Sequence, residues 1–212
     1  VDSSTIDFDS ARELHKQASD RGFRFIDGPV SGGVGGAQAG TLTFMLGGAD
    51  DAIADAKPVI EAMAGNIFHA GGEAAGQAAK IVNNMQLSIS LQGVVEGAVL
   101  AERFGLDPKV FFDIAKVSSG DSWPLRNWYP VPGVVETSPA EREFTPGFST
   151  MLMHKDVGLA LAGAKTQGVD LPAATLVYEK LQQLIDDGWG DADTSILIRN
   201  IDENAKGLPT EK

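Results

Sequence analysis

In the first third of the chain, short runs of apolar, aromatic and β-branched residues alternate with amphipathic stretches of helical period. This alternation predicts strands connected by helices, and therefore an α/β layer architecture. The expected helices cover residues 9–21 and 50–63, and the expected strands cover residues 23–27, 41–46 and 66–69. A glycine-rich loop, residues 30–36, lies between the first two of these strands. Asp9 or Ser10 is expected to cap the first helix.

After residue 73 only helical patterns remain, joined by loops. The longest covers residues 75–104, which would extend over about 45 Å at about 1.5 Å per residue, and Gly105 ends it. Asp107-Pro108 supplies an N-cap and a first-turn proline for the next helix. The other expected helices cover residues 108–116, 149–167, 173–187 and 194–206, and residues 118–147 form an irregular, proline-containing excursion. The pattern therefore predicts an α/β domain over residues 1–73 and an all-helical domain over residues 74–212.

Composition excludes several classes of function. The net charge of -12 argues against nucleic acid or an anionic membrane as a partner, because both require concentrated Lys and Arg. The chain has no cysteine, which excludes disulfides, thiolate catalysis and cysteine zinc sites. The most apolar window, residues 85–101, is interrupted by Gln86, Gln92 and Glu96, so no membrane span is expected. We expect a soluble, cytoplasmic protein.

The longest predicted helix opens with Gly76-Gln77-Ala78-Ala79-Lys80-Ile81-Val82-Asn83-Asn84. Lys80 and Asn84 stand four residues apart, so an ammonium and an amide would share one helix face. The positive end of the helix dipole disfavours the charged form of a nearby ammonium, which makes it a better proton donor and acceptor near neutral pH. The alternative is a solvated surface lysine beside an ordinary polar residue.

Ser31-Gly32-Gly33 offers a hydroxyl and flexible backbone N–H groups directly after a predicted strand. Such a loop can bind a carboxylate or a phosphate, although it can equally be a plain flexible turn. It differs from the dinucleotide fingerprint G-x-G-x-x-G, which a helix must follow, because residues 41–46 are expected to be a strand. We therefore expect this loop to bind something other than pyrophosphate.

Two further groups are candidates for a site. Lys155-Asp156 is a charged pair within a predicted helix with apolar neighbours, and such a pair is usually a surface ion pair. The aromatic residues of the excursion could line a pocket or pack the loop onto its domain; they are Trp123, Trp128 and Tyr129. The three histidines lack the spacing of metal ligands, so no metal is expected; they are His15, His69 and His154.

Taken in order, four motifs resemble the β-hydroxyacid dehydrogenase family over nearly the whole chain. They are Asp2-Ser3-Ser4-Thr5-Ile6, Asp27-Gly28-Pro29-Val30-Ser31-Gly32-Gly33, the segment from Gly76 to Asn84, and Lys155-Asp156. The resemblance implies the carboxyl-terminal part of a Rossmann-type domain, followed by a long interdomain helix and a helical domain. It also implies a homo-oligomer, either a dimer or a tetramer, that acts on a small hydroxy acid.

The resemblance assigns roles to residues that match the motifs. Lys80 would be the catalytic proton-transfer residue and Asn84 would orient the substrate. Ser31, Gly32 and Gly33 would hold the substrate carboxylate, with Trp123 and Asp156 also at the substrate. Thr5 and Lys155 would contact the cofactor, which is NAD, with NADP left open.

Within the family, the tract Pro130-Val131-Pro132-Gly133 favours oxidation of 3-hydroxyisobutyrate to methylmalonate semialdehyde in valine catabolism. The alternatives are an NADPH-dependent reductase of glyoxylate, succinic or tartronate semialdehyde, and a non-catalytic helical dimerisation module. The sequence lacks the family's G-x-G-x-x-G turn, and of the glycines that usually precede the lysine only Gly76 is present. The expectation is therefore a later part of a longer chain that lacks most of its dinucleotide site and could be inactive alone.

Overall fold

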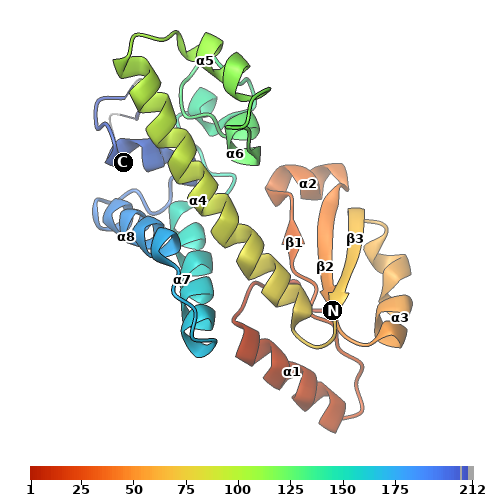
Figure 1. The fold of residues 1–212 in the computed structure, drawn as a ribbon. Coiled ribbons are helices and arrows are strands. Elements are labelled where there is room, and N and C mark those ends of the chain that lie inside the picture. Colours follow the sequence, from red (N-terminus) through yellow and green to blue (C-terminus); the bar gives the residue numbers. More distant parts are fainter. Residues whose placement is uncertain (206, 210–212) are drawn as a thin grey trace. The chain divides into compact units, whose positions relative to one another are not determined.

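The structure is a computed structural model that describes residues 1–205 and 207–209. It is a mixed α/β fold with a small sheet and many helices (Figure 1). Two compact units make up the chain, one formed by Val1–Asn84 with Ala162–Val169, the other by Met85–Leu161 with Asp170–Lys212. The α/β-plus-helical fold class is as predicted, and the domain boundary after residue 73 stays a prediction.

The first unit contains a three-stranded sheet in the order β1-β2-β3. Strand β2 pairs antiparallel with β1 and parallel with β3. Its core consists of apolar side chains from β2, from α3 and from the tract before β1, namely Ile26, Leu42, Phe44, Leu46, Ala52, Ile53 and Ile60. The elements are α1 (Phe8–Asp20), β1 (Val30–Ser31), α2 (Gly33–Ala39), β2 (Leu42–Gly47), α3 (Asp50–Ile60) and β3 (Ala64–Gly71).

The cap of α1 differs from the prediction. Asp7, rather than Asp9 or Ser10, is the N-cap, and its carboxylate accepts a hydrogen bond of 2.8 Å from the Ser10 backbone N–H. An N-cap side chain reaches the N–H three residues further on. The helix therefore begins at Phe8, and Ser10 supplies the donor instead of the cap.

The predicted strand 23–27 does not form a regular strand. Within it only Asp27 is bridged, in parallel to Asp2 and antiparallel to Gly47. Phe23 is largely exposed, although the aromatic alternation suggested a half-buried strand surface. The tract is thus irregular backbone, although its Ile26 side chain is buried in the core of the first unit.

The predicted glycine loop is also wrong in part, because residues 30–36 contain β1 and the start of α2. Gly32 has φ 128 and Gly33 has φ 59, both in the region that favours glycine. A Cβ at Gly32 or Gly36 would lie 3.2 Å from Leu42 Cδ2, so the small residues let this turn pack closely on β2. A helix of seven residues follows a strand here, contrary to the expectation of irregular backbone.

Helix α4 (Ala75–Arg103) begins in the first unit and continues into the second, close to the predicted bounds. Asp107 caps α5 as predicted, accepting from Val110 N at 3.0 Å. The predicted irregular excursion contains two short helices, and the predicted last helix is a 3₁₀ helix whose expected end, residue 206, lies outside the described residues. The remaining elements are α5 (Pro108–Ala115), α6 (Trp123–Asn127), η1 (Pro139–Arg142), α7 (Thr150–Thr166), α8 (Pro172–Asp186) and η2 (Thr194–Asn200).

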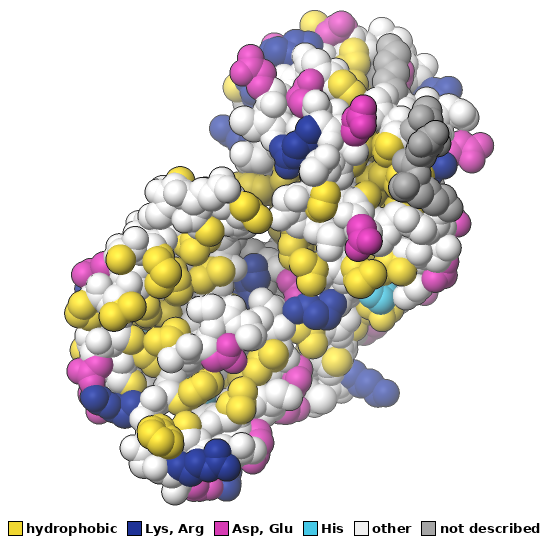
Figure 2. All heavy atoms as spheres, turned by 180° about the vertical axis from the view of Figure 1, so that it is seen from behind, with side chains coloured by type: hydrophobic (Ala, Val, Ile, Leu, Met, Phe, Trp, Pro, Cys, Tyr) yellow, Lys and Arg dark blue, Asp and Glu magenta, His cyan; other side chains and the backbone are white. Residues whose placement is uncertain are grey.

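The core of the second unit lies where α4, α7 and α8 supply apolar side chains, among them Leu91, Met153 and Leu181. In the part of the chain that the structure describes, no helix is both long and apolar enough to cross a membrane. On the face drawn in Figure 2, Lys and Arg side chains lie among Asp and Glu and do not form a continuous basic patch.

Candidate active site

Lys80 and Asn84 lie one turn apart on the amino-terminal part of α4. Both side chains are buried, with 9% of Lys80 and 2% of Asn84 exposed. A lysine and an asparagine are seldom buried without a structural or functional reason. The burial argues against the reading of Lys80 as a solvated surface lysine.

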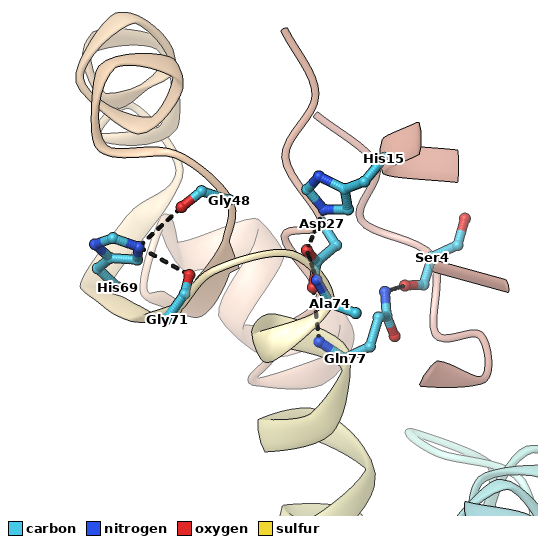
Figure 3. A network of polar contacts seen from close by, with 8 residues as sticks. All are labelled: Ser4, His15, Asp27, Gly48, His69, Gly71, Ala74 and Gln77. Carbon is cyan, nitrogen blue, oxygen red and sulfur yellow. Dashed lines mark hydrogen bonds and ion pairs between the residues drawn. The ribbon is translucent and has the colours of Figure 1, made fainter. Parts of the chain in front are cut away.

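The amino end of α4 is held by the carboxylate of Asp27, which is itself 1% exposed (Figure 3). Asp27 Oδ1 accepts from the Ala74 backbone N–H at 3.0 Å, and Oδ2 accepts from the Gln77 backbone N–H at 2.9 Å. The first N–H groups of a helix have no partner within it, and a negative charge there is favoured by the helix dipole. Asp27 therefore caps the helix that carries Lys80.

His15 completes the surroundings of this carboxylate. Its Nε2 lies 2.7 Å from Asp27 Oδ1, and its ring makes an edge contact with Phe25 at 4.8 Å between centroids. A buried carboxylate is tolerated when several donors surround it, and here two backbone amides and an imidazole do so. His15, Asp27, Ala74 and Gln77 form a connected cluster that we call the α4 clamp.

Two glycines allow the close packing of the α4 clamp. A Cβ on Gly76 would lie 2.3 Å from Met45 O and 2.8 Å from Asp27 O. A Cβ on Gly47 would lie 2.5 Å from Asp27 Oδ1 and 2.6 Å from Gly76 N. Only glycine fits at these two positions, because real Cβ atoms do not approach backbone so closely. The end of β2, Asp27 and the first turn of α4 are therefore in direct contact.

Gln77 connects the same helix turn to the segment that contains Thr5. Its buried side chain donates to Ser4 O at 2.7 Å and accepts from Ile6 N at 3.1 Å. Asp2, just before this segment, bridges in parallel to Asp27. Gln77 thus fixes the backbone on both sides of Thr5. This segment directly follows the parallel bridge at Asp2, and open α/β sheets bind ligands at the carboxyl ends of their strands.

Beside the clamp, His69 joins two glycine turns. Its Nε2 lies 3.1 Å from Gly48 O and 2.9 Å from Gly71 O (Figure 3). The Gly48 N–H in turn donates to Gly71 O at 3.0 Å. These contacts tie the turn after β2 to the turn that leads into α4.

Ser31 ends β1 opposite Thr43 of β2, while Gly32 and Gly33 start α2. Ser31 follows Asp27 by four residues, and Lys80 follows Gln77 by three, so both segments lead away from the clamp. The expected carboxylate-binding residues and the expected proton-transfer residue therefore belong to one unit.

The other predicted site residues belong to the second unit. Lys155 Nζ lies 2.9 Å from Asp156 Oδ1, with the lysine side chain 45% exposed and the aspartate 3% exposed. The pair is thus half buried, unlike an ordinary surface ion pair. Trp123 is largely exposed and packs edge-to-face on Trp128 at 5.0 Å between centroids.

Immediately before this pair, the His154 ring stacks on Tyr178 with 4.0 Å between centroids. Burial lowers the pKa of His154, and the negative charge of Asp186 partly opposes that effect. Within the described residues, no group of three or more His, Asp or Glu side chains is arranged to hold a metal ion.

Sequence reasoning missed the roles of His15, Asp27 and Gln77. Asp27 opens one of the four motifs, but the sequence assigns it no role there. The spacing of His15 excludes it as a metal ligand, and nothing in its local pattern connects it to a carboxylate. The signal that could have found Gln77 was its place in the motif before Lys80.

Two known families match successive parts of the chain. Residues 74–201 match the family described as NAD-binding of NADP-dependent 3-hydroxyisobutyrate dehydrogenase. Residues 1–72 match the NAD binding domain of 6-phosphogluconate dehydrogenase. Together the two matches cover nearly all of the chain.

Individual relatives are similar over most of this chain. The NAD-dependent L-serine dehydrogenase of Pseudomonas aeruginosa is 42% identical over 95% of this chain and 68% of its own length. The mitochondrial 3-hydroxyisobutyrate dehydrogenase of Drosophila melanogaster is 45% identical over 93% of this chain and 61% of its own length. The chain thus spans about two thirds of the relatives that it matches.

Among solved structures, that of Mycobacterium tuberculosis 3-hydroxyisobutyrate dehydrogenase with L-serine is 43% identical. The similarity extends over 95% of this chain and 69% of the Mycobacterium tuberculosis chain, and the TM-score is 0.91. The family matches and these identities agree with the ordered motifs. The chain therefore belongs to the β-hydroxyacid dehydrogenase family of NAD(P)-dependent oxidoreductases.

Proposed function

We propose that this chain carries the proton-transfer part of an NAD-dependent dehydrogenase that oxidises 3-hydroxyisobutyrate to methylmalonate semialdehyde. The observation that carries the proposal is the burial of Lys80 and Asn84, one turn apart, just beyond the clamped end of α4. Relatives named 3-hydroxyisobutyrate dehydrogenase support the substrate. In this role the protein serves valine catabolism in the cytoplasm.

The reaction removes two hydrogens from a primary alcohol. The neutral amine of Lys80 accepts the hydroxyl proton while the C–H bond of the same carbon breaks and a carbonyl forms. NAD, when bound, supplies the acceptor for the hydride. Asn84 orients the hydroxyl from the neighbouring helix turn, which fixes the direction in which the proton leaves.

Ser31, Gly32 and Gly33 hold the substrate carboxylate in this proposal. The Ser31 hydroxyl and the backbone N–H groups at the start of α2 are suitable donors for an anion. In this proposal the substrate must reach from this loop to the Lys80 amine with its carboxylate and its hydroxyl group. A short hydroxy acid carries the two groups close enough together for this. Trp123 and Asp156 are proposed to complete the substrate site.

Thr5 and Lys155 are the residues proposed to contact the cofactor. The segment around Thr5 fits such a role, because Gln77 fixes its backbone and it follows a parallel bridge at its carboxyl end. A half-exposed ammonium such as that of Lys155 can contact a cofactor phosphate or ribose. The matched family descriptions name both NAD and NADP, and we propose NAD.

The exact substrate is best identified by comparing kcat/KM across a panel of small hydroxy acids. One relative is named an L-serine dehydrogenase, and one similar structure contains L-serine. We therefore expect the full-length protein to oxidise 3-hydroxyisobutyrate with a higher kcat/KM than L-serine, glycerate or 4-hydroxybutyrate. A higher kcat/KM for NADPH-dependent reduction of a semialdehyde would favour the reductase alternative.

A homo-oligomer is proposed from an apolar face in the second unit. Helix α5 packs Phe112 and Ala115 into a core with α4, yet it also exposes large apolar residues on its other side. Together with the end of α4, the exposed residues are Leu100, Phe104, Val110, Ile114 and Val117. Large apolar side chains that are exposed together are often covered by a partner, and a second copy of this chain is the proposed cover.

The proposed catalytic role is tested by Lys80→Ala in the protein at its natural full length. We expect kcat/KM to fall roughly 10²- to 10⁴-fold, the usual contribution of a proton-transfer residue. The matched control is Lys57→Ala, because Lys57 is an exposed helical lysine of the same unit. An unchanged rate in Lys80→Ala, with the control also unchanged, would overturn the assignment.

A further inference from the structure

We propose that Asp27 and His15 are positioning residues for Lys80, which they place through the first turn of α4. The inference rests on the proposed role of Lys80 in proton transfer. Neither Asp27 nor His15 is proposed to touch the substrate. Their effect on the reaction passes through the backbone of the helix that carries the lysine.

The geometry of the clamp defines where the helix starts. Each oxygen of the Asp27 carboxylate accepts a different backbone N–H of the first turn, at 3.0 Å from Ala74 and 2.9 Å from Gln77. Two contacts to one rigid group fix both the position and the rotation of the turn. Lys80 follows Gln77 by three residues, about 4.5 Å along the helix axis, so a shift of the turn moves the amine directly.

The clamp is itself anchored to the sheet. The Asp27 backbone donates to Gly47 O at 3.1 Å and accepts from Gly47 N at 2.8 Å. His15 of α1 holds Oδ1 from a third direction at 2.7 Å. The carboxylate therefore has little freedom, and it transmits the position of β2 to α4.

Backbone strain at Ala74 indicates that the helix entry is imposed by its surroundings. Ala74 has φ 64, in the left-handed region that alanine rarely adopts, and its side chain is fully buried. Such a conformation persists when neighbouring contacts over-determine it. The Asp27 contact to the Ala74 N–H is one of these, whereas an ordinary stabilising cap requires no strained residue.

The first variant is Asp27→Asn, made in the full-length protein. An amide has one acceptor oxygen, so at least one of the two backbone N–H groups loses its partner while the side chain keeps its size. We expect kcat to fall roughly 10- to 100-fold, as expected for a misplacement of about 1 Å. We also expect the pH dependence of kcat to change, because the variant removes a formal negative charge from the turn that begins the helix carrying Lys80.

The matched control is Asp193→Asn in the second unit. Asp193 is also fully buried, and its Oδ2 accepts from Gly147 N at 2.9 Å and Phe148 N at 3.2 Å. The change removes the same kind of buried cap without touching the start of α4. It should lower the melting temperature while leaving kcat and its pH profile unchanged.

A second pair of variants tests His15 and does not depend on Asp27→Asn folding. His15→Gln keeps a side-chain N–H that can donate to Asp27, whereas His15→Leu removes it. We expect kcat near the wild-type value for His15→Gln and about 10-fold lower for His15→Leu. All rates are measured well below the melting temperature of each variant.

The outcomes separate this inference from the proposed function. If Lys80→Ala loses activity while Asp27→Asn and His15→Leu keep the wild-type kcat and pH profile, the positioning role is overturned and the function of Lys80 stands. If Lys80→Ala keeps its activity, the proposed function is overturned, and the positioning role that rests on it is overturned as well. If Asp27→Asn does not fold, equal kcat in the two His15 variants overturns the inference.

Discussion

At the scale of single residues, Gly76 is the position that the site tolerates least. An alanine there would place its Cβ 2.3 Å from Met45 O, and neither backbone can move without disturbing β2 or α4. We expect Gly76→Ala to destabilise the protein by about 3 kcal/mol, the upper end of the usual range for overpacking. The measurement is urea unfolding followed by circular dichroism.

Gly93 on the same helix provides the control for this substitution. Nothing lies within 4 Å of a Cβ built there. Gly93→Ala should therefore stabilise α4 by about 0.5–1 kcal/mol, since alanine restricts the unfolded chain without a clash. Equal effects of the two substitutions would contradict the close approach at Gly76.

Residue-scale prediction succeeded where the chemistry was local. Helical spacing alone placed Lys80 and Asn84 on adjacent turns, and the structure adds that both are buried. The clamp could not be predicted in this way, because Asp27 lies 12 residues from His15 and 50 from Gln77. The three residues lie in different segments of the chain, so no local periodicity connects them and only the folded chain reveals the contacts.

At the scale of elements, the packing of α7 on α8 is expected to depend on pH through His154. Burial lowers the pKa of His154 below its usual 6.5 in the folded state. The unfolded state then binds more protons between the two pKa values, so this contribution is complete above 6.5 and is lost as the pH falls towards the folded pKa. The free energy of unfolding should therefore decrease as the pH falls below 6.5.

His154→Phe isolates this contribution. Phenylalanine keeps a ring for the stack on Tyr178 but cannot take up a proton. Unfolding curves at several pH values should show a smaller loss of stability in the variant than in the wild type as the pH falls below 6.5. Parallel losses in the two proteins would refute the assignment.

Element-scale prediction was reliable for long, periodic segments and poor for glycine-rich ones. Helix α4 was expected over residues 75–104 and spans Ala75–Arg103, because a long helical pattern outweighs local ambiguity. Helix α2 was expected to be a loop, since glycine disfavours helix by about 1 kcal/mol per residue. Close packing against Leu42 on β2 overrides that preference, and the sequence pattern carries no sign of this tertiary contact.

At the scale of the whole molecule, the apolar face on α4 and α5 should govern self-association. Ile114 of α5 is 55% exposed and belongs to this face. Ile114→Asp introduces a charge that cannot be buried without a partner, so we expect a shift towards monomer in sedimentation equilibrium. Val59→Asp, at an exposed apolar residue of α3, should leave the assembly mass unchanged.

Self-association that persists unchanged in Ile114→Asp would show that this face is not the interface. A wild-type protein that remains monomeric at all concentrations would contradict the proposed oligomer altogether. Neither result bears on Lys80, since the face belongs to the second unit and Lys80 to the first.

The family-level fold was predictable because four motifs occur in order along the chain, although none of them is specific alone. The proposed chemistry depends on a narrower claim, that the Lys80 amine carries the proton. The most direct test measures NADH formation from 3-hydroxyisobutyrate by full-length Lys80→Ala, with and without added methylamine. We predict a large loss of rate that methylamine partly restores, with no effect of methylamine on the wild type. A Lys80→Ala variant that forms NADH at the wild-type rate without the amine would contradict the account.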